Sequence, residues 1–317
     1  MTRVLVTGAA GFIGSRLANE LQSRGHSVIG IDSFSAYYAP EIKRRRAADL
    51  RSQGVDVREA DLNTADLDDL LTNVNVVFHC AGQPGVRDSW GEQFGTYVSE
   101  NLLATQRLLN AAQRSPNPPR MIYSSSSSIY GNAETFPTSE AAVPSPVSPY
   151  GVTKLAAEHL FSLFGSEYSL RTVSLRYFTV YGPEQRPDMA FTRFLTAALR
   201  GTPITIFGDG SQRRDFTFVD DVVAANIAAA DSTVDPGSVF NVAGGGSASV
   251  NEVLDVIRRI TSRNLDVTYV PRTMGDAIRT GADTSAISAA LGWKPTVSLE
   301  DGLRAQWAWV SSVSGQA

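Results

Sequence analysis

The first half of the chain alternates short apolar, β-branched runs with stretches whose apolar residues recur about every 3.6 positions. The runs predict buried strands at residues 3–7, 28–32, 55–60, 74–80, 121–124 and 172–177. The stretches predict amphipathic helices at residues 12–24, 66–71, 101–114 and 150–164. Regular alternation of the two is typical of βαβ units, so we expect an α/β fold with a doubly wound parallel sheet covered by helices on both faces.

The alternation fades after about residue 181, and shorter elements follow. They are predicted helices at residues 191–199, 219–230 and 250–260 and predicted strands at residues 204–207, 239–242 and 265–270. We therefore expect a Rossmann domain over residues 1–181. Residues 182–317 are expected to form mainly a smaller, interleaved C-terminal α/β domain, with some segments returning to the first domain.

Composition narrows the class of protein. The chain has 317 residues, 43% of them hydrophobic, and a net charge of −4, which disfavours a nucleic-acid-binding protein. Cys80 is the single cysteine, so an intrachain disulfide is impossible and a reducing, cytoplasmic location is expected. The sequence has no signal-peptide pattern, no apolar run of the ~18 residues that a membrane span needs, and no residue cluster with metal-ligand spacing. A protein without membrane or metal partners is expected.

Three glycines, Gly8, Gly11 and Gly14, follow the first predicted strand and open the first helix. Glycine is needed where backbone N–H groups approach a pyrophosphate, which then lies at the positive end of the helix dipole. Asp32 ends the second strand 18 residues after Gly14, as expected for an acceptor of ribose hydroxyls. A carboxylate repels a 2′-phosphate, so NAD is favoured over NADP. The basic run at residues 44–46 would favour NADP, but we interpret it as a solvated helix face.

A tyrosine and a lysine, Tyr150 and Lys154, stand four residues apart near the start of a predicted helix and therefore share one face. Ser148 is its predicted N-cap and Pro149 its first residue. A phenol with a pKa of about 10 is a poor base at neutral pH, and a nearby ammonium group stabilises its phenolate. With ten tyrosines and three lysines in the chain, about 0.1 accidental pairs at this spacing are expected, so the pair indicates an acid–base unit.

The order of these motifs resembles the extended short-chain dehydrogenase/reductases, and within them the NAD-dependent epimerase/dehydratase group. The resemblance covers nearly the whole chain. It is carried by the glycine loop, the serine run at residues 124–128 closing in Tyr130-Gly131, Tyr150 with Lys154, Arg176-Tyr177-Phe178, Arg213-Arg214-Asp215-Phe216, and residues 282–284 and 291–295.

The resemblance implies a role for each matching residue. Ser126 hydrogen-bonds the reacting oxygen, Tyr150 exchanges its proton, and Lys154 both tunes Tyr150 and holds the nicotinamide ribose. Because alignment within a serine run is ambiguous, Ser125 or Ser127 stays open as the working serine. The implied cofactor contacts are Gly8, Gly11, Phe12, Ile13, Gly14, Asp32, Asp61, Leu62, Ala81, Gly82, Asn101, Tyr150 and Lys154. The implied substrate contacts are Arg87, Ser126, Ser127, Ser128, Tyr150, Thr179, Arg186, Phe207, Arg214, Arg272 and Asp276.

The residues after Ser126 favour one reaction of this family. Its dehydratases and decarboxylases carry acids there, to protonate a leaving hydroxyl or to serve carboxylate chemistry, whereas this chain has Ser127 and Ser128. We therefore expect a 4-epimerase. In that reaction NAD takes hydride from sugar C4 while Tyr150 takes the O4 proton, the 4-keto sugar turns about its diphosphate link, and the hydride returns to the other face.

Residues 179–190 are similar to a segment of UDP-glucuronate 4-epimerases in which Arg-Pro-Asp-Met recurs and threonine stands where galactose epimerases carry asparagine. Thr179, Ser127 and Ser128 offer hydroxyl groups to a sugar carboxylate, and Arg186 offers a charge. UDP-glucuronate, converted to UDP-galacturonate, is the expected substrate. The alternative substrates are UDP-glucose and UDP-GlcNAc. The alternative functions are a net 4-ketoreductase and a non-catalytic binding module. Because the helices at residues 101–114 and 150–164 resemble the family's dimer contact, a homodimer is expected.

Overall fold

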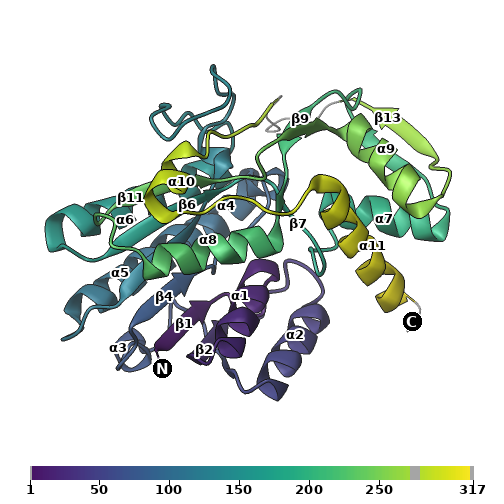
Figure 1. The fold of residues 1–317 in the computed structure, drawn as a ribbon. Coiled ribbons are helices and arrows are strands. Elements are labelled where there is room, and N and C mark those ends of the chain that lie inside the picture. Colours follow the sequence, from purple (N-terminus) through teal and green to yellow (C-terminus); the bar gives the residue numbers. More distant parts are fainter. Residues whose placement is uncertain (1, 272–278, 315–317) are drawn as a thin grey trace.

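The computed structural model describes residues 2–271 and 279–314. Within this part, one parallel sheet has seven strands in the order β11-β6-β5-β4-β1-β2-β3 (Figure 1). They are β1 (Arg3–Thr7), β2 (Ser27–Asp32), β3 (Asp56–Glu59), β4 (Val76–His79), β5 (Arg120–Ser126), β6 (Thr172–Tyr177) and β11 (Ser238–Val242). The chain builds outward from β1 to β3 and then from β4 in the other direction, so the predicted doubly wound α/β fold is confirmed.

Helices cover both faces of this sheet (Figure 1). One face carries α1 (Phe12–Ser23), α2 (Pro40–Ser52) and α8 (Val219–Asp231), and the other carries α3 (Leu67–Leu70), α5 (Ala104–Arg114) and α6 (Pro149–Tyr168). Side chains alternate along β1, because Val4 and Val6 pack in the core with Leu17 whereas Leu5 packs in the core with Phe161. Burial on both faces explains why the strands are apolar throughout.

The second half of the chain forms a smaller core of its own. It consists of α7 (Ala190–Arg200), α9 (Val250–Thr261) and α11 (Leu299–Ser314) together with the parallel pair β8 (Ile204–Phe207) and β13 (Val267–Val270). Figure 1 shows this region to one side of the large sheet. Two elements of the second half, β11 and α8, nevertheless belong to the large sheet and its helical layer. The division at residue 181 stays a prediction.

Other elements were not predicted or differ from their prediction. The helix expected at residues 101–114 is part of a longer helical run, in which α4 (Phe94–Tyr97) continues through a π-helical segment (Val98–Leu103) into α5. Helices α10 (Ser285–Leu291) and α11 were not predicted from the sequence. Short strands pair as β7 (Val180–Tyr181) with β10 (Thr217–Phe218) and as β9 (Arg213–Asp215) with β12 (Ser247–Ser249).

Helix α2 was not predicted, and one of its three consecutive arginines differs from the expectation. Its 13 residues bury only two apolar side chains, Ala47 and Leu50, so its periodicity was too weak to predict the helix. The basic run at residues 44–46 does lie on it, and Arg44 and Arg45 are exposed as expected. Arg46 is not solvated, because its side chain is only 2% exposed.

Candidate active site

The glycine loop between β1 and α1 depends on the absence of side chains. A Cβ on Gly14 would lie 2.1 Å from the Gly8 carbonyl oxygen, and a Cβ on Gly8 would lie 2.8 Å from the Ala81 nitrogen. Gly8 also has a φ of 69°. Helix α1 begins after its N-cap Gly11 with neither a side-chain cap nor an acidic residue in its first turn. A narrow loop leading to an uncapped helix start fits the pyrophosphate of NAD.

The carboxylate of Asp32 lies at the end of β2, where a ribose acceptor is expected. Its Oδ2 accepts a hydrogen bond from Ala10 N at 3.1 Å and its Oδ1 accepts one from Phe34 N at 2.8 Å. Lys43 Nζ lies 3.6 Å from Oδ1 and donates to the Ser35 hydroxyl at 3.0 Å. The basic residue beside Asp32 is therefore Lys43, which the sequence analysis did not consider.

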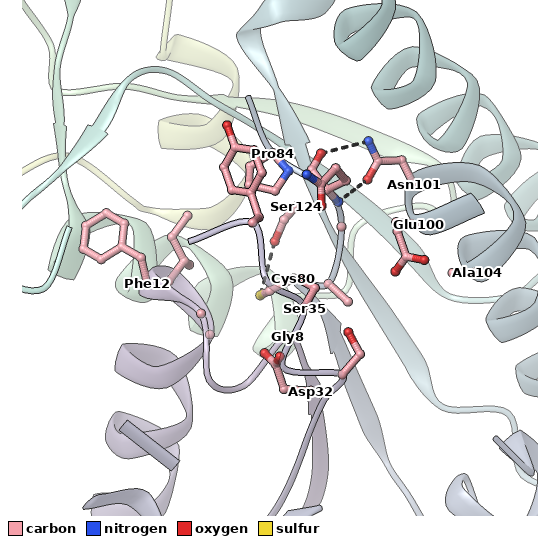
Figure 2. A pocket seen from close by; sticks show the side chains of 18 of the residues that line it. Gly8, Phe12, Asp32, Ser35, Cys80, Pro84, Glu100, Asn101, Ala104 and Ser124 are labelled. Atoms are coloured by element: carbon pink, nitrogen blue, oxygen red, sulfur yellow. Dashed lines mark hydrogen bonds between the residues drawn. The ribbon is translucent and has the colours of Figure 1, made fainter. Parts of the chain in front are cut away.

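The expected cofactor residues line one pocket (Figure 2). In Figure 2, Gly8 and Asp32 lie at one end and Ser124 and Asn101 at the other. The Asn101 side chain accepts from Gln83 N at 2.7 Å and donates to Gln83 O at 3.1 Å. The lining residues that the sequence analysis predicted are Gly8, Gly11, Phe12, Ile13, Gly14, Asp32, Asp61, Leu62, Ala81, Gly82, Asn101, Tyr150, Lys154 and Arg186. Those it missed include Tyr37, Tyr38, Lys43, Cys80, Gln83, Pro84 and Glu100.

Helix α6 brings Tyr150 and Lys154 to this pocket. The helix begins as predicted, because the Ser148 hydroxyl accepts from Gly151 N at 3.1 Å and Pro149 is the first helical residue. Tyr150 is partly buried, and its side chain hydrogen-bonds that of Ser126 at the end of β5. Lys154 is buried and donates to the Ser124 carbonyl oxygen at 2.5 Å.

Burial and two neighbouring side chains shift the pKa of Tyr150. Burial raises the pKa of Tyr150, and the hydrogen bond with Ser126 and the positive charge of Arg186 partly lower it. Burial also lowers the pKa of Lys154 to about 7. Arg186 is thus a positive charge that acts on Tyr150, and the tuning role of Lys154 stays a prediction.

The serines of the run have different partners. Ser124 donates to Cys80 Sγ at 3.3 Å, and Ser125 donates to Glu158 Oε2 at 2.6 Å. Glu158 is itself buried and paired with Arg176 at 2.7 Å. Ser126 accepts from Ser128 N at 3.1 Å and shares a hydrogen bond with Tyr150. This geometry favours Ser126 over Ser125 as the working serine, because the hydroxyl of Ser125 is committed to Glu158.

Of the expected substrate residues that the structure describes, Tyr150 and Arg186 line the pocket and the others do not. Arg186 lines the pocket, pairs with Asp188 at 2.8 Å, and places its guanidinium 5.5 Å from the centre of the Tyr37 ring. Ser127 and Ser128 belong to a short 3₁₀ turn (Ser127–Ile129) directly after β5. Thr179 is partly buried between β6 and β7.

Two further substrate candidates from separate parts of the chain are in contact. The guanidinium of Arg87 lies 4.4 Å from the centre of the Phe207 ring, although 120 residues separate them in sequence. Arg214 lies on β9 and donates to the Arg213 carbonyl oxygen at 2.9 Å. Arg272 and Asp276 lie outside the described residues.

Other expectations concern histidine, metals and membranes. His79 is fully buried, and its ring nitrogens bond the hydroxyls of Thr7 and Thr105 at 2.8 Å each, as for a satisfied core histidine. Across residues 2–271 and 279–314, no group of three or more His, Cys, Asp or Glu side chains is placed to hold a metal ion. In the same ranges, every helix is too short or too polar to cross a membrane. The cytoplasmic location stays a prediction.

This fold and pocket define a class of enzymes that transfer hydride by means of a bound dinucleotide. A glycine loop, an acidic residue at the end of β2, Tyr150 and Lys154 all face one pocket of a doubly wound sheet, and Ser126 hydrogen-bonds Tyr150. The model of the NAD dependent epimerase/dehydratase family matches residues 4–243, and the chain belongs to this family. The family's cofactor is NAD, the dinucleotide that Asp32 favours.

Similar proteins cover nearly the whole chain. The Bacillus subtilis (strain 168) protein named uncharacterized UDP-glucose epimerase YtcB is 41% identical over 98% of this chain and 98% of its own. UDP-glucuronate 4-epimerase 1 of Arabidopsis thaliana is 36% identical over 98% of this chain and 77% of its own. The UDP-glucuronic acid 4-epimerase of Bacillus cereus, solved with UDP-glucuronic acid and NAD, is 40% identical with a TM-score of 0.94, covering 98% of this chain and 100% of its own.

Proposed function

We propose that this enzyme is an NAD-dependent UDP-sugar 4-epimerase that interconverts UDP-glucuronate and UDP-galacturonate. The observation that carries the proposal is the position of Arg186, a cation that lines the pocket and acts on Tyr150. Arg186 stands in a site where Ser126 is followed by hydroxyls and not by acids. Relatives named as UDP-glucuronate 4-epimerases, in Arabidopsis thaliana and Bacillus cereus, support both the reaction and the sugar.

The chemistry follows from few groups. NAD, when bound, supplies a reversible hydride acceptor for sugar C4. Tyr150 takes the O4 proton when the 4-keto sugar forms and returns it after the sugar has turned. Ser126, which shares a hydrogen bond with Tyr150, donates to the same oxygen and holds it near the phenol. The hydrogen bond from Ser126 and the positive charge of Arg186 favour the phenolate form of Tyr150 against the effect of burial.

The carboxylate of the sugar needs its own restraint. A 4-keto glucuronate is a β-keto acid. It loses carbon dioxide when the bond from the sugar ring to the carboxylate carbon aligns with the π system of the C4 carbonyl. We propose that Thr179 and Ser128 hold the carboxylate out of that alignment through their hydroxyls. The test is Thr179→Ala on UDP-glucuronate, for which we expect slower epimerisation and release of a UDP-pentose. Unchanged turnover with no pentose would overturn the role of Thr179.

One experiment tests both the reaction and the sugar. Purified enzyme is given UDP-glucuronate, UDP-glucose and UDP-GlcNAc in separate reactions without added NAD(P)H, and the C4 proton is followed by NMR. We expect UDP-glucuronate to equilibrate with UDP-galacturonate fastest and without net NADH. If turnover requires stoichiometric NAD(P)H, the enzyme is a 4-ketoreductase and the proposed epimerase activity is overturned.

UDP-glucose is the second candidate substrate. It is favoured by the Bacillus subtilis relative, whose name gives UDP-glucose and whose identity to this chain is 41%. Thr179 decides between the two sugars in our proposal, because its hydroxyl has a carboxylate to bind only in the glucuronate. Faster turnover of UDP-glucose in the same experiment would make it the substrate.

We also propose a homodimer formed through α5 and α6. Leu103, Val152 and Leu163 lie on or next to these helices and are 52%, 48% and 50% exposed, which favours their burial against a second copy. We expect light scattering to give a dimer for the wild type and a monomer for Leu163→Glu. Val143→Glu is the matched control, because Val143 is 85% exposed but lies on a loop. A monomeric wild type would overturn the proposal.

A further inference from the structure

Three loops meet at the border of the NAD pocket. The first follows β2 and carries Tyr37, the second follows β4 and carries Asp88, and the third carries Arg186. The Tyr37 hydroxyl donates to Asp88 Oδ2 at 2.9 Å, and the Arg186 guanidinium lies 5.5 Å from the centre of the Tyr37 ring. Both Tyr37 and Arg186 line the pocket. Tyr37 therefore joins loops that are 51 and 149 residues away in sequence.

The loop of Arg186 is also tied to the glycine loop, through Arg46. The Arg46 side chain pairs with Glu184 Oε2 at 3.0 Å and donates to the Glu184 carbonyl oxygen. It also donates to Ala10 O at 3.4 Å and to the Tyr38 hydroxyl at 3.2 Å. The Arg46 side chain is only 2% exposed and that of Glu184 is 31% exposed, so this tie is mostly buried. The link between Tyr37 and Asp88 differs, because Asp88 is exposed and Tyr37 partly exposed, so it can open without disturbing the core.

We propose that Tyr37 and Asp88 form a clasp that keeps NAD and NADH in the protein between the two hydride transfers. The clasp rests on the proposed epimerase function. In that reaction, NADH that leaves after the first hydride transfer leaves the 4-keto sugar without a hydride donor. Tyr37 lines the pocket and Asp88, on the segment after β4, holds its hydroxyl, so opening the link would free this wall of the pocket for a dinucleotide to leave. Burial and the bond to Asp88 both raise the pKa of Tyr37, so its hydroxyl stays a donor over the whole working pH range.

The experiment measures cofactor retention directly. Purified holoenzyme is dialysed at length, and the NAD(H) released on denaturation is quantified per protein chain. A hydrogen bond to a charged group contributes to the free energy that keeps the clasp closed. We therefore expect Tyr37→Phe to lose cofactor about tenfold faster than the wild type. In turnover, free NADH is expected to accumulate with this variant, and its rate is expected to recover with excess NAD. Tyr269→Phe is the matched control, because the Tyr269 hydroxyl bonds Asn251 Oδ1 at 3.0 Å in the C-terminal region.

A double-mutant cycle separates a clasp from two unrelated effects. If Tyr37 and Asp88 act as one link, Asp88→Ala should release cofactor about as fast as Tyr37→Phe, and the double variant should be no faster than either. Additive effects, or a Tyr37→Phe enzyme that retains cofactor as the wild type does, would overturn the clasp. Retention is measured without substrate, so a wild type that holds NAD but leaves UDP-glucuronate unchanged would overturn only the proposed substrate.

Discussion

The glycine-loop end of the pocket is shaped by the backbone, whereas the Tyr150 end is shaped by side chains. At the first end, Gly8 and Gly14 approach backbone atoms so closely that no Cβ fits. At the second, Ser126, Tyr150 and Lys154 are held by hydrogen bonds that one atom's removal would break. Substitutions at the first end should therefore abolish cofactor binding, and substitutions at the second should slow chemistry in a folded protein that still binds NAD.

The largest expected effect is that of Gly14→Ala. The added Cβ would lie 2.1 Å from the Gly8 carbonyl oxygen, so the loop must move and the pyrophosphate site is lost. We expect no measurable bound NAD and no activity, as determined by cofactor content and NMR assay. Gly95→Ala is the control, because a Cβ at Gly95 meets no atom within 4 Å. A Gly14→Ala protein with full NAD content would contradict the backbone account of this end.

The next effect is that of Tyr150→Phe. Removing the phenol oxygen removes the proton acceptor but leaves the fold and the NAD pocket in place. We expect kcat to fall by about 10²- to 10⁴-fold, with normal NAD content and an unchanged thermal midpoint. A variant that lost its NAD as well would show that the two ends are not built independently.

A smaller effect distinguishes neighbouring serines. Ser126→Ala is expected to lower kcat by about 10²-fold, because it removes one donor to the reacting oxygen, with little change in unfolding free energy. Ser125→Ala removes a donor to the buried Glu158 and should instead lower the unfolding free energy by about 1–3 kcal/mol, with a smaller loss of kcat. Kinetics and urea denaturation of both variants measure this, and the reverse pattern would make Ser125 the working serine.

The smallest effect concerns His79, which joins the two ends. It bonds Thr7 beside the glycine loop and Thr105, whose hydroxyl donates to the Asn101 carbonyl. Burial lowers the pKa of His79 to about 3, so its stabilising contribution is complete above its unfolded pKa of about 6.5 and is lost as pH falls toward the folded value.

We therefore expect wild-type stability to fall by up to about 1.4 kcal/mol per pH unit below pH ~6.5 from this group alone. Urea titrations between about pH 7 and about pH 4 measure this fall in the free energy of unfolding. The free energy of unfolding of His79→Asn should depend less steeply on pH than that of the wild type. His159→Asn, a substitution of an exposed histidine, is the matched control. Equal slopes for wild type and His79→Asn would contradict the assignment.

Features that depend on local spacing were predictable from the sequence. The glycine loop, Asp32 at the end of β2 and the Tyr150–Lys154 pair each follow from positions within one βα unit or one helix turn. The sheet was predictable because its strands are buried on both faces and hence apolar throughout.

Contacts between distant segments were not predictable. Lys43 approaches Asp32 because α2 packs against α1 and β3, and Arg87 meets Phe207 across the two halves of the chain. The link from Tyr37 to Asp88 joins two loops whose sequences give no sign of pairing. In each case the partners are set by tertiary packing, and hydrophobic periodicity carries no information about it.

The edge position of β11 has a consequence for how the protein is made. This strand pairs with β6, yet it is synthesised more than sixty residues later. Its Asn241 also accepts a hydrogen bond from Tyr130, which in turn binds the buried Arg176. Until residue 242 leaves the ribosome, the nascent chain carries an unpaired sheet edge and a polar cluster that lacks one of its hydrogen-bond acceptors. A fragment ending near residue 181 should therefore aggregate, and the enzyme should reach its native state only after most of the chain has been translated.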